Sequence, residues 1–116
     1  MSGPLHGLKV LELGTLIAAP FASRLLAEFG ADVTKVEDPK TGDPIRNWRY
    51  LHQGTSLWWY VQARNKKSVT ANLKHPEGCD FVRRLIADAD ILVENFRPGV
   101  LEKLGLRPEG RMREHV

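Results

Sequence analysis

The sequence has little cysteine and no long apolar run. Cys79 is the single cysteine among 116 residues, so an intrachain disulfide is impossible and a cysteine-based metal site is not expected. No segment approaches the roughly 18 to 20 uninterrupted apolar residues that a membrane span needs. The N-terminal stretch MSGPLHGLKV lacks the basic and then apolar layout of a secretion signal. We therefore expect no membrane partner and a cytoplasmic location.

Several motifs of common enzyme classes are also missing. The four histidines are scattered, without the i, i+4 spacing of a metal-binding pair, so we predict no metal site. The segment GTLIAAP has one glycine where a dinucleotide-binding loop needs three, which disfavours a nicotinamide-dependent enzyme. No Walker-type phosphate loop and no Ser, His and Asp set stand out.

The charge balance is mildly basic. The formal net charge is +3, and the surplus cations are spread along the chain. Such an excess fits an anionic small ligand, whereas nucleic-acid binding requires a clustered basic face, so we expect no nucleic-acid partner. The apolar share of 42% and charged share of 27% are ordinary for a soluble globular protein.

Strand-like and helix-like segments alternate along the chain. A helix is predicted to begin around Pro20 and to stop at Gly30, and Phe81, Leu85 and Ile86 are expected to face the core from a later helix. This alternation predicts an α/β fold, a Rossmann-like open parallel sheet with flanking helices. Strands are expected at residues 8–14, 31–37, 67–73 and 90–96, and further helices at 74–89 and 98–106.

The stretch from Asp38 to Tyr60 interrupts this alternation. It is rich in proline, glycine and turn-forming residues, and it contains the three tryptophans Trp48, Trp58 and Trp59. Long irregular excursions in compact domains are usually functional or covered by a partner. The tryptophans suit a substrate wall or a subunit interface, and we favour the interface.

Ligands of open α/β sheets bind outside the carboxyl ends of the strands. Lys74, Arg97 and Lys103 are placed to face phosphate there, and Phe96 to pack against a flat ring. Taken singly, each signal has a plainer interpretation, since charged residues at strand ends are often just solvated and an aromatic residue there often belongs to the core edge. The expected strand ends are residues 14–19, 38–46, 71–75 and 95–99.

Five motifs together resemble a known family. GADVTKVE, GDPIR, NKKS, HPEG and VENFRPG follow one another in the order and spacing of family III CoA-transferases, the group that includes formyl-CoA transferase, carnitine CoA-transferase and α-methylacyl-CoA racemase. The resemblance covers residues 4–106. It implies a large Rossmann-like domain, two interlocked subunits in a homodimer, and acyl-CoA and carboxylic acid substrates.

The resemblance also implies which residues contact coenzyme A. Two departures from the family pattern lie close by, because Asp38 stands where many members have a basic residue and Ala19 where they have glycine. The implied contact residues are Ile17, Ala18, Ala71, Asn72, Leu73, Lys74, Asn95, Phe96, Arg97 and Lys103.

Family III transferases use an aspartate that forms a mixed anhydride with the acyl group and then a thioester with coenzyme A. In the family this aspartate lies beyond position 116, and no acid of this chain matches it. We therefore expect residues 1–106 to be the N-terminal, CoA-binding part of an incomplete transferase fold, and residues 107–116 to be a divergent charged tail. The alternatives are a non-catalytic CoA- or nucleotide-binding module, a racemase-type fragment, or a remnant that does not fold stably.

Overall fold

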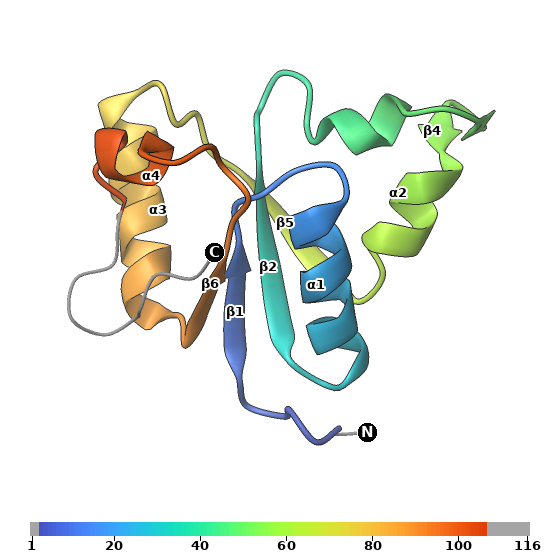
Figure 1. Ribbon diagram of the computed structural model, residues 1–116, viewed down its shortest axis with the longest axis horizontal. Coiled ribbons are helices and arrows are strands. Elements are labelled where there is room, and N and C mark those ends of the chain that lie inside the picture. The colour runs from blue at the N-terminus through green and yellow to red at the C-terminus, as the bar shows by residue number, and fades with distance from the viewer. Residues whose placement is uncertain (1–2, 107–116) are drawn as a thin grey trace.

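Four parallel strands form the centre of the structure, a computed structural model that describes residues 3–106 (Figure 1). Their order across the sheet is β5-β2-β1-β6, so the first two strands of the chain lie in the middle. The strands are β1 (Lys9–Glu12), β2 (Asp32–Glu37), β5 (Lys66–Thr70) and β6 (Ile91–Val93). The predicted α/β parallel sheet with flanking helices is confirmed.

The register places the carboxyl ends of all four strands at one edge. Leu11 of β1 pairs with Thr34 of β2 on one side and with Leu92 of β6 on the other, and Thr34 pairs in turn with Lys67 of β5. In Figure 1 this edge is at the top, opposite the N-terminus. The loops that leave the four strands therefore lie next to one another.

Helix α1 (Ala18–Glu28) packs on the sheet through small residues. Ala19, Ser23 and Ala27 are buried at four-residue spacing, which lets the helix approach the strands closely. The larger apolar residues at the same spacing lie on the outer face, with Phe21 45% and Phe29 55% exposed. The helix ends before Gly30, as predicted, and the φ of +104° at Gly30 explains why glycine suits that position.

Helix α3 (Pro76–Asp88) covers the opposite face of the sheet. Its first turn is capped by the His75 side chain, whose Nδ1 accepts a hydrogen bond from the Glu77 amide at 3.2 Å. Cys79, Val82 and Ile86 are the buried residues of this helix, and Phe81 packs partly buried against the same core. Phe81, Leu85 and Ile86 therefore contact the core, as predicted, although Phe81 and Leu85 are less deeply buried than Val82.

The excursion between β2 and β5 contains short elements that lie beside α1 (Figure 1). They are η1 (Pro44–Asn47), β3 (Leu51–His52), β4 (Thr55–Ser56) and α2 (Leu57–Gln62). The last element of the described chain is α4 (Val100–Lys103), on the α3 side. Within residues 3–106, no helix has the length and apolar character that crossing a membrane requires.

Candidate functional site

A pocket of about 300 Å³ opens at the carboxyl edge of the sheet. All four strand-end loops contribute to its lining, so segments far apart in the sequence meet there. The lining residues are Leu13, Thr15, Val36, Glu37, Asp38, Thr41, Gly42, Asp43, Pro44, Ala71, Asn72, Leu73, Lys74 and Phe96. The strand-end prediction thus identified loops that share one cavity.

The lining combines an apolar floor with a polar rim. Leu13, Val36 and Ala71 are buried, and Phe96 packs against the same core cluster. Lys74, at the rim, is exposed. The lining also contains three acids. Glu37 and Asp43 are buried and paired with cations, so Asp38 and Lys74 are its exposed charges.

The loop after β5 is held in shape by close packing with α3. The Asn72 Oδ1 accepts a hydrogen bond from the Lys74 amide at 3.0 Å. A Cβ at Gly78, in the first turn of α3, would lie 2.0 Å from the Asn72 carbonyl oxygen, so only glycine fits there. The two contacts fix the backbone that carries Lys74.

Asn95 joins the loop after β6 to the loop after β1. Its Oδ1 accepts a hydrogen bond from the Thr15 amide at 3.0 Å, and its Nδ2 donates one to the Thr15 carbonyl at 2.9 Å. The side chain of this predicted contact residue is therefore engaged with the neighbouring backbone. It shapes the pocket by fixing Thr15, which lines it.

The remaining predicted contact residues do not line the pocket. Ile17 is 37% exposed, and Ala18 begins α1. Arg97 and Lys103 are exposed, the latter on α4. By contrast, Ala71–Lys74 and Phe96 belong to the lining.

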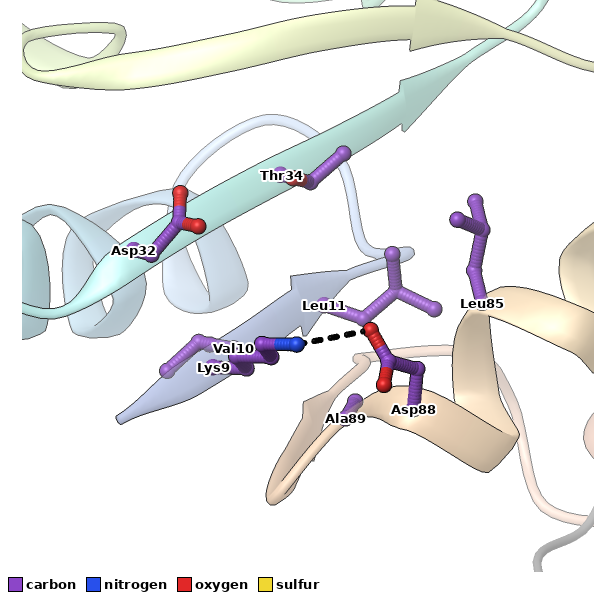
Figure 2. A pocket seen from close by; sticks show the side chains of 8 residues that line it. All are labelled: Lys9, Val10, Leu11, Asp32, Thr34, Leu85, Asp88 and Ala89. Atoms are coloured by element: carbon purple, nitrogen blue, oxygen red, sulfur yellow. Dashed lines mark hydrogen bonds and ion pairs between the residues drawn. The ribbon is translucent and has the colours of Figure 1, made fainter. Parts of the chain in front are cut away.

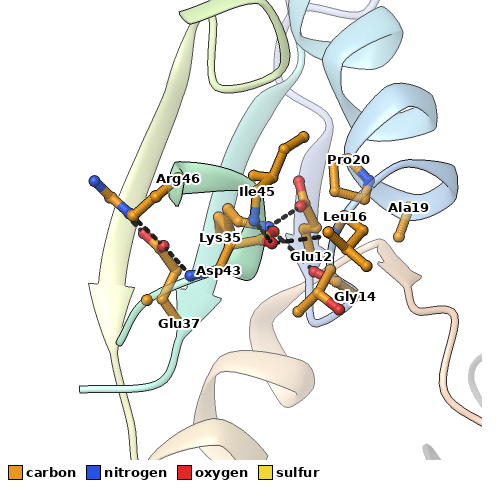
Figure 3. Close-up of polar contacts among 12 residues, drawn as sticks. Glu12, Gly14, Leu16, Ala19, Pro20, Lys35, Glu37, Asp43, Ile45 and Arg46 are labelled. Atoms are coloured by element: carbon orange, nitrogen blue, oxygen red, sulfur yellow. Dashed lines mark hydrogen bonds and ion pairs between the residues drawn. The ribbon is translucent and has the colours of Figure 1, made fainter. Parts of the chain in front are cut away.

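Asp43, which lines the pocket, belongs to a group of buried charges (Figure 3). Lys35 forms ion pairs with Glu12 and, at 2.7 Å, with Asp43, while Lys66 lies 2.6 Å from Glu12. The four side chains are at most 2% exposed, and two cations balance two anions. Burial lowers the pKa of Lys66, and the charge of Glu12 opposes that shift.

A third buried acid, Glu37, anchors the 38–46 loop, which forms one wall of the pocket. Glu37 receives two hydrogen bonds from Arg46, at 2.7 and 2.8 Å, and another from Ser68. Burial alone would raise the pKa of Glu37, but these bonds and one from the Asp43 amide lower it to about 2. The Arg46 guanidinium also stacks 3.6 Å from the Trp59 ring centroid.

A smaller cavity of about 150 Å³ lies toward the amino ends of β1 and β2 (Figure 2). Its main polar feature is the pair between Lys9 and Asp88, whose side chains are 53% and 73% exposed. Exposed pairs of this kind contribute little to stability and are screened by salt. No group of three His, Cys, Asp or Glu side chains within residues 3–106 is arranged to hold a metal ion.

Sequence reasoning missed the buried charges. Glu12 and Lys35 belong to segments that were predicted only as strands, and Lys66 directly precedes another. The available signal was a charged residue inside an otherwise apolar central strand, which is stable only when paired.

The sequence profile of CoA-transferase family III matches residues 5–115. Succinyl-CoA--D-citramalate CoA-transferase of Chloroflexus aurantiacus is 55% identical over 104 residues, which are 89% of this chain and 26% of that protein. The succinyl-CoA:glutarate CoA-transferase of Homo sapiens is 43% identical over 104 residues, 89% of this chain and 24% of that protein.

The chain is also similar to solved structures. A CAIB/BAIF family protein from Brucella suis matches with a TM-score of 0.85 and 41% identity, over 94% of this chain and 30% of that chain. The chain spans about a quarter of the length of the curated relatives it matches. Because the profile match extends over nearly all of its length, the chain belongs to CoA-transferase family III.

Proposed function

We propose that this chain supplies the coenzyme A binding part of an enzyme that moves coenzyme A from an acyl-CoA to a carboxylic acid. The observation that carries the proposal is the convergence of four strand-end loops on one pocket with an apolar floor and a lysine at its rim. Such a site matches the two chemical characters of coenzyme A, a flat nucleobase and charged phosphates.

In the proposed complex, the backbone of Ala71–Leu73 frames the adenine, with Phe96 at the opposite side of the pocket. Lys74 meets a phosphate from the rim. Arg97 and Lys103, which lie outside the pocket lining, extend this basic surface toward the rest of the ligand. Ile17, Ala18 and the backbone of Asn95 complete the proposed contact set.

The acyl-transfer step needs a carboxylate that is free to attack a thioester. Glu12, Glu37 and Asp43 are the buried acids of the described residues, and each is bound to a lysine or an arginine. None of these three paired acids is therefore available as a nucleophile. We propose that the attacking aspartate of the family belongs to a part of the enzyme other than residues 3–106, which bind and orient the coenzyme.

The named relatives favour a transferase over the racemase or non-catalytic alternatives. Their names state that they act on succinyl-CoA together with citramalate or glutarate. We therefore propose succinyl-CoA as donor and a small dicarboxylic acid as acceptor. A cytoplasmic location stays a prediction.

Association into a homodimer forms part of the same proposal. The outer faces of α1 and α2 expose apolar side chains, among them Phe21, Phe29, Trp58 and Tyr60. Surfaces of this kind mark contacts with another protein surface. Sedimentation equilibrium tests this: a dimer that Phe21→Ser with Phe29→Ser dissociates supports the proposal, and a monomer at all concentrations contradicts it.

Calorimetric titration of the chain with coenzyme A tests the binding function. We expect one site, weaker binding of pantetheine, which lacks the nucleotide, and no acyl transfer by the chain alone. Absence of binding heat from a sample shown to be folded by circular dichroism contradicts the proposal. Measurable acyl transfer by the chain alone would show that the nucleophile belongs to this chain, contrary to the proposal.

A further inference from the structure

The corner between β1 and α1 is held in a strained shape. Leu16 has a φ of +66°, in the left-handed region that residues with a Cβ rarely adopt. Its amide donates a hydrogen bond to Oδ1 of Asp43 at 3.0 Å, across 27 positions of sequence (Figure 3). Non-glycine residues keep such a conformation only where their surroundings impose it, so the Asp43 bond is a candidate for what imposes it.

The Asp43 carboxylate is itself fixed on every side. It is 1% exposed, its Oδ1 also accepts from the Ile45 amide at 3.0 Å, and its Oδ2 lies 2.7 Å from Nζ of Lys35. The Asp43 amide donates to Glu37 at 2.8 Å. These contacts hold the carboxylate next to the Leu16 amide.

The two buried lysines, Lys35 and Lys66, also donate hydrogen bonds to the backbone of the β1–α1 corner. Lys35 donates to the Gly14 carbonyl at 3.1 Å, and Lys66 donates to the Pro20 carbonyl at 2.9 Å. The backbone on both sides of Leu16 is thus tied to the buried charges. Among these buried charged residues, Asp43 is the one that also belongs to the 38–46 loop and lines the pocket.

We propose that Asp43 is a positioning residue of the coenzyme A site. It couples the 38–46 wall of the pocket to the β1–α1 corner, and so sets the place of Thr15 in the lining and of Ile17 and Ala18 beside it. The inference rests on the proposed coenzyme A binding. Asp43 acts through backbone groups and is not itself a contact for phosphate, which its negative charge would repel.

Asp43→Ala and Asp43→Asn separate this role from general stabilisation. Alanine removes the acceptor for Leu16. Asparagine keeps an oxygen there, but it removes the charge and places an NH2 donor in place of the oxygen that faces Lys35. Val33→Ala is the matched control, because Val33 is 1% exposed and belongs to a core cluster that excludes the pocket residues. It lowers stability without touching the corner.

Two measurements on the 116-residue chain are needed. The first is the dissociation constant for coenzyme A, at a temperature where every variant is folded. We expect Asp43→Ala to raise it about tenfold, as the loss of one hydrogen bond to a charged acceptor implies. Asp43→Asn should raise it less, and Val33→Ala should leave it unchanged within about twofold.

The second is amide hydrogen exchange at Leu16, which needs no ligand. Protection should be present in the wild type, lost in Asp43→Ala, and kept in Asp43→Asn and Val33→Ala. If Asp43→Ala stays folded, protects Leu16 and binds coenzyme A like the wild type, the positioning role is wrong. If the wild type binds no coenzyme A, the proposed function fails, and the exchange data alone then decide whether Asp43 holds the corner.

Discussion

Replacing Glu37 with glutamine should lower stability by an amount that depends on pH. Glutamine has nearly the same shape, but it carries no charge and turns one acceptor oxygen into a donor facing Arg46 or Ser68. The Glu37 side chain is 2% exposed, so water does not replace the lost bonds. The pocket wall anchored by Arg46 is therefore expected to loosen.

The magnitude follows from the pKa of Glu37. Burial raises it, but the bonds from Arg46, Ser68 and the Asp43 amide bring it from 4.5 down to about 2. A drop of that size corresponds to about 3 kcal/mol, which we reduce to about 2 to 3 kcal/mol because the Arg46 side chain is 37% exposed. Since the pKa is lower in the folded state, this stabilisation is complete above pH 4.5 and is lost as the pH falls toward 2.

Urea unfolding followed by tryptophan fluorescence measures the effect, since Trp59 stacks on Arg46. The stability gap between wild type and Glu37→Gln should be about 2 to 3 kcal/mol at pH 7 and fall by about half between pH 5 and pH 3. Asp88→Asn, in the exposed pair with Lys9, is the control and should show no change at any pH. A gap that is absent at pH 7, or constant down to pH 3, would refute the reasoning.

Three further outcomes are expected. Ile45→Ala should destabilise the chain by about 2 to 5 kcal/mol in chemical denaturation, because Ile45 is fully buried and the cavity cannot collapse; a loss below about 1 kcal/mol would contradict its core role. Gly78→Ala should reduce hydrogen-exchange protection around Asn72 and weaken coenzyme A binding, because the new Cβ would meet the Asn72 carbonyl; unchanged protection would show that the contact yields freely. Lys74→Ala should raise the dissociation constant for coenzyme A about tenfold or more while Lys67→Ala, at an exposed position before the strand end, leaves it unchanged; equal effects would remove Lys74 from the phosphate site.

Much of the fold could be predicted from the sequence because its signals are local. Gly30 ends a helix through its own backbone freedom, and His75 with Pro76 begins another, so short stretches of chain determine these boundaries. The alternation of such elements then restricts the sheet to a few parallel arrangements. The strand ends, and with them the loops that share the pocket, follow from the same alternation.

The side chains that organise the site were not predictable in the same way. A hydrogen bond connects the Leu16 amide to Asp43, 27 positions away in the sequence. Lys66 forms an ion pair with Glu12 only because β5, β2 and β1 lie side by side. No spacing along the chain encodes these long-range pairs. Phe21 is 45% exposed because the smaller Ala19, Ser23 and Ala27 lie against the sheet.

The most direct test of the account is a coenzyme A titration followed by amide chemical shifts of the labelled chain. Shifts are predicted at residues 14–18, 71–74 and 95–97, at one edge of the sheet, and none around Lys9 and Asp88 at the other. Changes that cluster at the amino ends of the strands, or a folded chain whose spectrum does not respond to coenzyme A, would contradict the account.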